Sequence, residues 1–372
     1  MRLLISGGGT GGHVYPALAV IEQVWKRSSA PSGHAGVDLL YVGRAASIEE
    51  HLAARAQIPF QPIDVGGIRG LAPWTAAQNL VRLAKSVRRA RAIIRSFRPS
   101  VILATGGYVS APVVWAGAAE RVPSVVYLPD LEPGWAIRAT ARWATRIAVS
   151  FPEVSRYFRS SQVVVTGYPV RARFYETNRE KARQMLRLEP NACTVTVYGG
   201  SQGAHHINQA VVANLPELAR QAQIIHITGQ SDEAWAKGQI DQLPHELQSR
   251  VHVFGYLNEE LPDALAAADI AVARAGASSL GELPALGLPA ILVPYPFAGR
   301  HQELNCAYLT RAGAAIRVGD ATLADELVPS VRKLFGAPEQ LKSMSRAAQS
   351  LAQPQAAERI RLLLQSVARE AA

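Results

Sequence analysis

The sequence predicts an α/β fold of two doubly wound parallel-sheet domains, and two observations predict it. A short apolar strand runs into a glycine-rich turn and then into a helix near residue 7, and the same succession recurs near residue 199. This order is the building unit of a doubly wound parallel sheet. The chain also has 372 residues, whereas one domain commonly takes roughly 100–200. We therefore expect two Rossmann-like domains that face a cleft, each opening with one of these turns.

The first glycine-rich turn predicts an anion-binding site. An apolar strand, 3–5, leads into Gly7-Gly8-Gly9-Thr10-Gly11-Gly12-His13, and the following helix is expected to begin near Pro16. Unpaired backbone N–H groups and the dipole at a helix N-terminus attract phosphate, and glycines let it approach the main chain. His13 adds an imidazole that can accept a proton near neutral pH.

The same turn also fits the dinucleotide-binding pattern G-x-G-x-x-G, through Gly7, Gly9 and Gly12. That pattern expects an acidic residue after the second strand, whereas strand 39–42 is followed by Gly43 and Arg44. Because an arginine suits a 2′-phosphate, these residues alone leave the dinucleotide alternative open.

Further strands and turns predict the domain boundary. Strand 101–104 precedes a second glycine turn at 105–110, and strand 194–198 precedes a third at 199–206, with a helix from about 207. Strand 162–165 meets the turn-rich Gly167-Tyr168-Pro169. We expect a first domain at 1–166 and a second at 167–352. An amphipathic last helix is expected at about 356–369.

The composition indicates a cytoplasmic protein without a membrane span or a metal site. The apolar runs are shorter than the roughly 20 residues of a spanning helix, and no signal peptide is expected before the first turn. Cys193 and Cys306 are the only cysteines, and the nine histidines show no metal-ligand spacing. His205 and His206 are expected at the surface.

A basic segment at 82–98 accounts for part of the net charge of +10. Its arginines and one lysine surround an apolar stripe of Leu83, Val87, Ile93, Ile94 and Phe97. With Ile68, Leu71 and Trp74 upstream, this pattern predicts a peripheral patch for an anionic membrane. An ordinary packed helix with a solvated basic face is an equal alternative. Nucleic acid ranks low, since no nucleic-acid module accompanies the charge.

The second half carries two further candidate segments. Strand 270–273 is followed by a small-residue turn and by Glu282, which we expect about two turns into a helix. A carboxylate there can accept paired hydrogen bonds from a ribose diol, although a solvated surface charge is the plain alternative. Arg300-His301-Gln302-Glu303-Leu304-Asn305 opens another helix with amide side chains that suit sugar hydroxyls, or that simply begin a polar helix.

Six segments in this order resemble the MurG family of bacterial cell-wall glycosyltransferases over nearly the whole chain. They are Gly8-Gly9-Thr10-Gly11-Gly12-His13-Val14-Tyr15-Pro16, Thr105-Gly106-Gly107-Tyr108-Val109-Ser110, Pro169-Val170-Arg171, Gly199-Gly200-Ser201-Gln202-Gly203, the segment 274–282 and His301-Gln302-Glu303-Leu304-Asn305. The resemblance implies a GT-B fold in which the last segment, about 353–372, completes the first domain. It also implies transfer of N-acetylglucosamine from UDP-GlcNAc to lipid I, the polyprenyl-diphosphate-linked muramoyl-pentapeptide. The product is lipid II, made for peptidoglycan at the cytoplasmic face of the cell membrane, with other cell-wall synthesis proteins as possible partners.

The resemblance also implies roles for individual residues. His13 is the expected general base, with binding of the acceptor diphosphate as its rival role and Asp130 as the other candidate base. Gly106, Gly107, Tyr108 and Ser110 are expected on the side of the site that binds the acceptor. The Tyr256–Leu257 region borders the uracil, Glu282 takes the ribose and Gln302 the N-acetylglucosamine. The donor site comprises Thr10, Gly11, Gly12, Arg171, Ser201, Gln202, Gly203, Leu257, Ala277, Ser278, Ser279, Leu280, Gly281, Glu282 and Gln302.

Two segments depart from the family pattern. The family's His-Glu-Gln-Asn run before Pro-Gly reads Tyr127-Leu128-Pro129-Asp130, and its Gly-Asn-Pro reads Gly167-Tyr168-Pro169. A carboxylate at Asp130 repels a diphosphate unless it is protonated, paired or used as a base. A related transferase with another acceptor, a UDP-GlcNAc 2-epimerase and a non-catalytic nucleotide-sugar sensor therefore stand as alternatives. The expected reaction is an inverting displacement that needs no metal or other cofactor.

Overall fold

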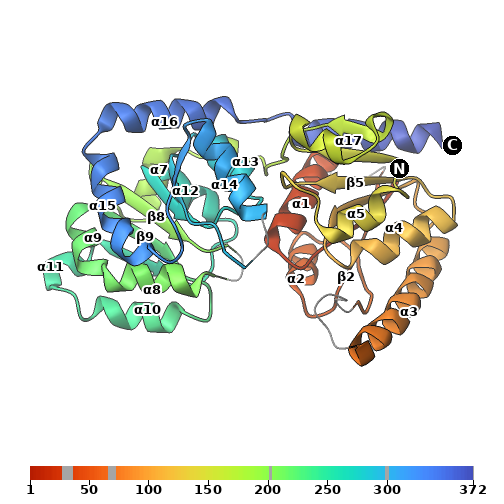
Figure 1. Ribbon diagram of the computed structural model, residues 1–372, viewed down its shortest axis with the longest axis horizontal. Helices are drawn as coiled ribbons and strands as arrows, with labels where there is room; N and C mark the ends of the chain where they lie inside the picture. Colours follow the sequence, from red (N-terminus) through yellow and green to blue (C-terminus); the bar gives the residue numbers. More distant parts are fainter. Residues whose placement is uncertain (27–36, 66–72, 201–202, 298–300, 372) are drawn as a thin grey trace. The chain divides into compact units, whose positions relative to one another are not determined.

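The chain forms two compact α/β units in this computed structural model, which describes residues 1–26, 37–65, 73–200, 203–297 and 301–371, with the backbone alone at 73–80. Unit 1 comprises Met1–Arg171 together with Gln355–Ala372, and unit 2 comprises Ala172–Pro354. The division after Arg171 lies beyond the expected boundary at 166, and the return to unit 1 lies at 355 rather than 353. Each unit is a parallel sheet with helices around it (Figure 1).

Unit 1 holds a seven-stranded parallel sheet in the order β3-β2-β1-β4-β5-β6-β7. Its strands are β1 (Arg2–Gly7), β2 (Asp38–Gly43), β3 (Phe60–Pro62), β4 (Val101–Gly106), β5 (Ser124–Leu128), β6 (Arg146–Val149) and β7 (Val163–Val165). Its helices are α1 (Gly11–Lys26), α2 (Ile48–Arg55), α3 (Pro73–Phe97), α4 (Ser110–Ala119), α5 (Trp135–Ala141), the 3₁₀ turns η1 (Pro152–Tyr157) and η2 (Ser160–Gln162), and α17 (Ala356–Glu370).

Successive side chains of the unit 1 strands pack alternately into two separate hydrophobic cores, one on each face of the sheet. Leu3 and Ile5 of β1 pack with α1, α2 and α17, whereas Leu4 packs with α3 and α4 on the other face. This alternation follows from the two-residue period of a strand, and it explains why the strand reads as a continuous apolar run. Helix α17 lies beside α1 (Figure 1) and supplies Ile360, Leu364 and Val367 to the first core. Each fully buried aliphatic side chain stabilises the fold by about 1.5–3 kcal/mol.

Helix α3 packs through its apolar stripe. Ile93 and Ile94 are buried in the second core of unit 1, with Val87 and Phe97 packed against them. The packed-helix alternative is therefore correct for the stripe, which is not available to a membrane. Ile68 and Leu71 lie outside the described residues, and Trp74 lies in α3 rather than in a loop. No helix among the described residues is long and apolar enough to cross a bilayer.

Unit 2 holds a six-stranded parallel sheet in the order β10-β9-β8-β11-β12-β13. Its strands are β8 (Thr194–Tyr198), β9 (Gln223–Ile227), β10 (Val251–Phe254), β11 (Ile270–Ala273), β12 (Ala290–Leu292) and β13 (Ala315–Arg317). Its helices are α6 (Arg173–Glu176), α7 (Arg179–Met185), α8 (His205–Ala213), α9 (Leu215–Gln221), α10 (Glu233–Ile240), α11 (His245–Gln248), α12 (Leu261–Ala266), α13 (Ser279–Leu286), α14 (His301–Arg311), α15 (Leu323–Phe335) and α16 (Pro338–Ser350).

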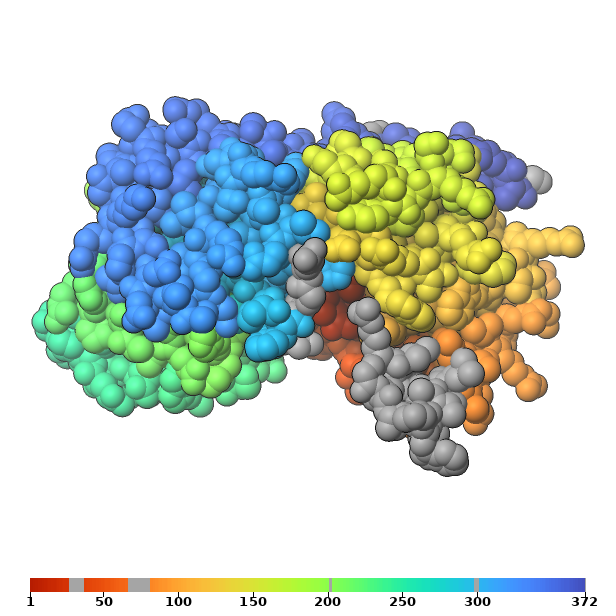
Figure 2. All heavy atoms as spheres, viewed as in Figure 1, coloured from red at the N-terminus to blue at the C-terminus, as the bar shows by residue number. Residues whose placement is uncertain are grey.

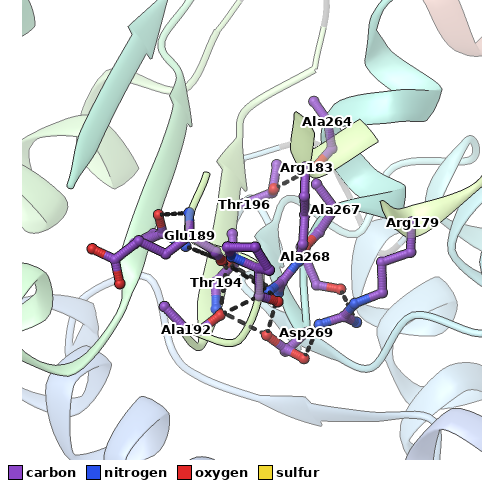
Figure 3. Close-up of polar contacts among 12 residues, drawn as sticks. Arg179, Arg183, Glu189, Ala192, Thr194, Thr196, Ala264, Ala267, Ala268 and Asp269 are labelled. Carbon is purple, nitrogen blue, oxygen red and sulfur yellow. Dashed lines mark hydrogen bonds and ion pairs between the residues drawn. The ribbon is translucent and has the colours of Figure 1, made fainter. Parts of the chain in front are cut away.

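A buried arginine ties together the amino ends of two unit 2 strands (Figure 3). Arg183 of α7 donates to the carbonyl oxygens of Ala267 and Ala192, at 2.9 and 3.0 Å, and pairs with Asp269 at 3.0 Å. Asp269 in turn accepts from the Thr194 N–H at 2.9 Å. Burial lowers the pKa of Arg183, and Arg179 adds to that effect. Because β8 begins at Thr194 and β11 just after Asp269, this network braces the end of the sheet opposite to its carboxyl edge.

Candidate active site

The first glycine-rich turn, after β1, and the third, after β8, each lie at the switch point of their sheet, where the strand order reverses. In unit 1 the strand order reverses between β1 and β4, where Gly7 pairs with Gly106. In unit 2 it reverses between β8 and β11, so the turns after Tyr198 and Ala273 are neighbours. In open α/β sheets ligands bind outside the carboxyl ends of the strands at this point. The topology therefore gives each unit one candidate site.

His13 lies in the first turn of α1, because this helix begins at Gly11. The expected start near Pro16 was wrong. The His13 N–H already donates to the Thr10 carbonyl oxygen at 3.1 Å, and Pro16 lies inside the helix. A proline so close to the N-terminus removes one intrahelical hydrogen bond, which this helix tolerates. Gly11 and Gly12 thus belong to the helix rather than to the turn before it.

The backbone of the first turn orients the His13 imidazole. His13 Nδ1 lies 3.0 Å from the Gly8 carbonyl oxygen, and the Thr10 hydroxyl oxygen lies 3.4 Å from the same nitrogen. A carbonyl oxygen only accepts, so the hydrogen bond assigns the proton to Nδ1. Nε2 of the neutral ring then carries the lone pair that a general base needs.

The second glycine turn packs directly on this imidazole. Gly106 has φ +109°, and a Cβ at this position would lie 2.8 Å from His13 Cδ2. Gly107 follows, and its carbonyl oxygen accepts from the Ser110 hydroxyl at 2.9 Å. Tyr108 is exposed. The structure therefore gathers His13, Gly106, Gly107 and Ser110 at the β1/β4 switch point.

Arg171 packs on α1 within unit 1. Its guanidinium lies over the Tyr15 ring, 4.6 Å from the ring centroid, and the residue is buried. A guanidinium on an aromatic face keeps its charge and its donor groups while its stem is held in place. This places a cation on the helix that also carries His13.

Asp130 lies just beyond the end of β5, beside a buried tyrosine. The Tyr127 hydroxyl is 2.7 Å from the Ser150 hydroxyl, and the Tyr127 ring meets the Tyr168 ring edge-on at 6.5 Å. Burial raises the pKa of Tyr127 well above its usual range, and the negative charge of Asp130 raises it further. Asp130 itself is half-buried. The departures from the family pattern, Tyr127, Asp130 and Tyr168, are therefore neighbours.

In unit 2 two helices begin at the switch point. The Gly203 N–H donates to the Gly200 carbonyl oxygen at 3.0 Å, just before α8. Ser201 and Gln202 lie outside the described residues. After β11, the Ser279 hydroxyl donates to the Arg274 carbonyl oxygen at 2.9 Å and closes the turn that starts α13. That helix start contains the remaining predicted donor positions, Ala277, Ser278, Leu280 and Gly281.

Glu282 is buried in the first turn of α13. It lies closer to the helix start than the expected two turns, and the solvated alternative is wrong, since only 4% of the residue is exposed. Burial raises the pKa of Tyr198 at the end of β8, and the charge of Glu282 contributes. The carboxylate therefore lies near the β8/β11 switch point.

Gln302 and Leu257 flank this region of unit 2. The Gln302 side-chain oxygen accepts from the Tyr295 N–H at 2.8 Å, which leaves the Gln302 amide group to donate. Leu257 and Tyr256 follow β10 and are half-buried. Within the described ranges, no group of three or more His, Cys, Asp or Glu side chains is arranged to hold a metal ion.

Sequence reasoning missed a polar chain behind α8. The buried His226 ring nitrogen Nε2 lies 3.0 Å from Asn208 Oδ1, and the Asn208 amide donates to Asp232 at 2.7 Å. Asp232 also pairs with His205 at 2.9 Å. Burial lowers the pKa of His226 to about 4, so the ring is neutral. His205 and His206 are exposed as expected, although each pairs with an aspartate, Asp232 and Asp320.

Known proteins resemble both units. Residues 3–149 match the glycosyltransferase family 28 N-terminal domain, and residues 194–360 match the family's C-terminal domain. Over 99% of the chain and 95% of the relative, the sequence is 39% identical to the UDP-N-acetylglucosamine–N-acetylmuramyl-(pentapeptide) pyrophosphoryl-undecaprenol N-acetylglucosamine transferase of Roseiflexus sp. (strain RS-1). The transferase of the same name from Halalkalibacterium halodurans is 36% identical over 99% of the chain and 100% of the relative.

Solved structures share the fold. MurG of Acinetobacter baumannii superposes with a TM-score of 0.73 at 23% identity, covering 98% of this chain and 99% of that one. The UDP-GlcNAc 2-epimerase of Neisseria meningitidis, bound to UDP-GlcNAc, gives 0.70 at 14% identity over 98% and 100%. At these identities both show the GT-B architecture alone. The family domains and the full-length identities establish that the chain belongs to glycosyltransferase family 28, among the UDP-N-acetylglucosamine–N-acetylmuramyl-(pentapeptide) pyrophosphoryl-undecaprenol N-acetylglucosamine transferases.

Proposed function

We propose that the protein transfers N-acetylglucosamine from UDP-GlcNAc to the muramoyl-pentapeptide of lipid I and so forms lipid II for peptidoglycan. The observation that carries this function is the 39% identity, over 99% of the chain, to a transferase named for this reaction. The epimerase alternative shares only the fold, at 14% identity.

Unit 2 is the proposed donor domain. The N-termini of α8 and α13 lie at the β8/β11 switch point, where the positive ends of the helix dipoles suit a diphosphate. The buried Glu282 carboxylate is the proposed acceptor of hydrogen bonds from the two ribose hydroxyls. The Gln302 amide group donates to the N-acetylglucosamine, and the region of Tyr256 and Leu257 borders the uracil. Ser201 and Gln202 keep their proposed diphosphate role on the resemblance alone.

Unit 1 is the proposed acceptor domain, and His13 is the proposed general base. The acceptor hydroxyl attacks the anomeric carbon while its proton passes to His13 Nε2. The bond from that carbon to the diphosphate oxygen breaks, and UDP leaves from the opposite face with its electron pair. This displacement inverts the anomeric centre. The support is the hydrogen bond of Nδ1 to the Gly8 carbonyl oxygen, which leaves Nε2 able to accept.

The charge that develops on UDP is met, in this proposal, by protein groups rather than by a metal cofactor. Arg171 supplies a guanidinium, and the helix start after Gly203 supplies N–H groups. Such fixed donors act as electrostatic catalysts because they need no reorganisation when the charge appears. Thr10, Gly11 and Gly12 lie beside His13 in unit 1, and they keep their proposed donor role on the resemblance alone.

We further propose peripheral association with the cytoplasmic face of an anionic membrane through α3. Arg82, Lys85, Arg88 and Arg89 are exposed on this helix, and Val81 is 56% exposed beside them. On the face drawn in Figure 2, α3 lies at the surface of unit 1 (orange). Each such cation near an anionic leaflet contributes about 1 kcal/mol. Sedimentation with anionic liposomes at low salt, and its loss in a variant with all four cations changed to glutamine, tests this.

The first experiment follows radiolabelled UDP-GlcNAc with and without a short-chain lipid I analogue. Label in the lipid product that depends on the acceptor supports the proposed transfer, whereas conversion of the donor without an acceptor indicates an epimerase. Donor binding without transfer points to a different acceptor, in line with Asp130 at the departure from the family pattern.

A substitution of His13 tests its assignment as the general base. H13A is expected to lower kcat by about 10²–10⁴-fold, the usual contribution of a general base, with little change in the KM for UDP-GlcNAc. The exposed His51 provides the matched control, H51A, which should keep the parental rate. Unchanged turnover in H13A would move the base role to Asp130.

A further inference from the structure

A buried carboxylate lies against the first glycine-rich turn. Glu49 of α2 is 1% exposed, and its Oε2 accepts from the Gly9 N–H at 3.3 Å. Its Oε1 accepts from the Arg44 N–H at 3.2 Å. The approach is close, because a Cβ at Gly8 would lie 2.3 Å from Glu49 Oε1. Since both oxygens face N–H donors, the arrangement fits the ionised form.

One peptide group connects this carboxylate to His13. The amide between Gly8 and Gly9 donates its N–H to Glu49 and accepts the His13 Nδ1–H on its carbonyl oxygen, at 3.3 and 3.0 Å. A negative charge at the N–H end of an amide increases the negative charge on its oxygen, because linked hydrogen bonds polarise one another. The Gly8 oxygen is thereby a stronger acceptor for the imidazole than an isolated carbonyl.

We propose that Glu49 is a positioning residue for His13 that acts through the Gly8–Gly9 peptide. The inference rests on the proposed function, in which His13 accepts a proton. In a serine-protease triad an aspartate holds the histidine directly and stabilises the imidazolium that forms. Here the peptide group stands between carboxylate and imidazole, and it transmits both effects. It keeps the proton of the neutral ring on Nδ1, and it stabilises the charged ring after transfer.

The other titratable groups around this peptide do not provide the same connection. The Tyr41 hydroxyl of β2 donates to the Gly7 carbonyl oxygen at 2.7 Å, and burial, followed by the charge of Glu49, raises its pKa. Glu50 accepts from the Ala46 N–H at 2.7 Å, and His51 is exposed on α2. Arg171 lies over Tyr15 further along α1. Glu49 differs from these groups because its carboxylate bonds to the backbone of the turn that holds His13.

The test compares E49Q with E50Q in the full-length protein. E49Q keeps the shape of the side chain and removes its charge, and E50Q makes the same change at the neighbouring capping residue. NMR of the His13 ring nitrogens gives the tautomer without any need for activity. We expect E49Q to increase the share of the Nε2–H tautomer, because the Gly8 carbonyl oxygen becomes a weaker acceptor for the Nδ1–H. E50Q should match the parent.

Kinetics give the second readout. E49Q is expected to lower kcat about tenfold, to move the acidic limb of the pH profile to lower pH, and to leave the KM for UDP-GlcNAc unchanged. A purely structural role would instead alter KM and thermal stability together. E49D retains the charge and should lie nearer to the parent than E49Q in both readouts.

The outcomes separate this inference from the proposed function. If H13A keeps full turnover, the base assignment fails whatever E49Q does. If H13A is inactive while the His13 tautomer is the same in E49Q and in the parent, only the role of Glu49 is overturned. Should E49Q not fold, the parent protein still tests the role of Glu49. A neutral His13 ring found with its proton on Nε2 would contradict that role.

Discussion

The ring of Tyr168 meets the ring of Tyr127 edge-on, with the centroids 6.5 Å apart and the planes at 70°. These two positions belong to the two segments in which the chain departs from its family's sequence pattern. Their contact brings the two segments together at the carboxyl edge of the unit 1 sheet.

Replacing Tyr168 by the family's asparagine should destabilise unit 1. Tyr168 is 4% exposed, so Y168N leaves a cavity beside Tyr127 and buries a polar amide, at a cost of about 3 kcal/mol in unfolding free energy. Urea denaturation measures the change. Y175N is the control at an exposed tyrosine, where a loss of under about 0.5 kcal/mol is expected. Equal losses in the two variants would contradict the packing role of Tyr168.

Adding a methyl group at Gly106 should impair catalysis. A Cβ there would lie 2.8 Å from the His13 ring, in a backbone conformation of φ +109°. Because G106A displaces the imidazole, we expect kcat to fall about 10²-fold, as misplacement of a catalytic group by about 1 Å does.

The control for that variant is G238A, in helix α10. A Cβ at Gly238 meets nothing within 4 Å, so the change should leave kcat alone and stabilise the helix by about 0.5–1 kcal/mol. Parental turnover in G106A would show that the His13 position does not depend on this contact.

Removing the charge of Glu282 should weaken donor binding specifically at the ribose. E282Q is expected to raise the KM for UDP-GlcNAc about tenfold, because a charge-assisted pair of hydrogen bonds is lost, while kcat changes less. A donor that lacks both ribose hydroxyls should bind parent and E282Q equally. If E282Q weakens that donor as much as UDP-GlcNAc, Glu282 does not contact the ribose. E326Q, at an exposed glutamate of α15, is the control.

The buried arginine of Figure 3 should contribute more to stability than its exposed neighbour. R183M removes the buried partner of Asp269 and the donor to several carbonyl groups, and we expect unit 2 to lose about 3 kcal/mol. Arg179 also pairs with Asp269 but is 46% exposed, so R179M should cost less than about 1 kcal/mol. Chemical denaturation of both variants checks the order, and a larger loss in R179M would reverse the assignment.

The buried His226 predicts a pH dependence of stability. Its pKa is lowered to about 4 in the folded protein by burial, against 6.5 for an exposed histidine. Between these pH values the unfolded chain binds a proton that the folded chain does not, so stability is complete above about pH 6.5 and falls as pH drops toward 4. The loss attributable to this group is about 3 kcal/mol.

A variant isolates that contribution. H226Q keeps a side chain able to hydrogen-bond Asn208 but cannot take up the proton, so its unfolding free energy should fall less than that of the parent over this range. Parallel curves for the two proteins would assign the acid sensitivity to other groups.

Prediction from sequence succeeded where the residues of one short segment determine its secondary structure. Strands 194–198 and 270–273 have the predicted bounds, because their apolar and β-branched residues are buried on both faces of a sheet. It failed where a local signal had two meanings. Pro16 indicated a helix start but lies inside α1, and Glu282 was expected about two turns into its helix but lies in the first turn.

The role of Glu49 was beyond sequence reasoning for a different physical reason. Its partners are backbone groups of Gly9 and Arg44, on separate segments that meet only when β1 and β2 pair. Ser47 and Glu50 have the spacing of a capping box, which predicts a helix start. This pattern does not predict a partner for the Glu49 side chain. His13, by contrast, lies within a motif that carries its own backbone partner, Gly8.

Helix α17 has a consequence for how the protein is made. Ile360, Leu364 and Val367 belong to the same core as α1, yet they are translated after all of unit 2. Domains generally fold as units during synthesis. On the ribosome, the apolar face of α1 therefore stays uncovered by α17 until unit 2, Ala172–Pro354, has emerged. Unit 1 is therefore completed after unit 2, so the first turn, with its His13 imidazole, rests on a finished core only once α17 has been made.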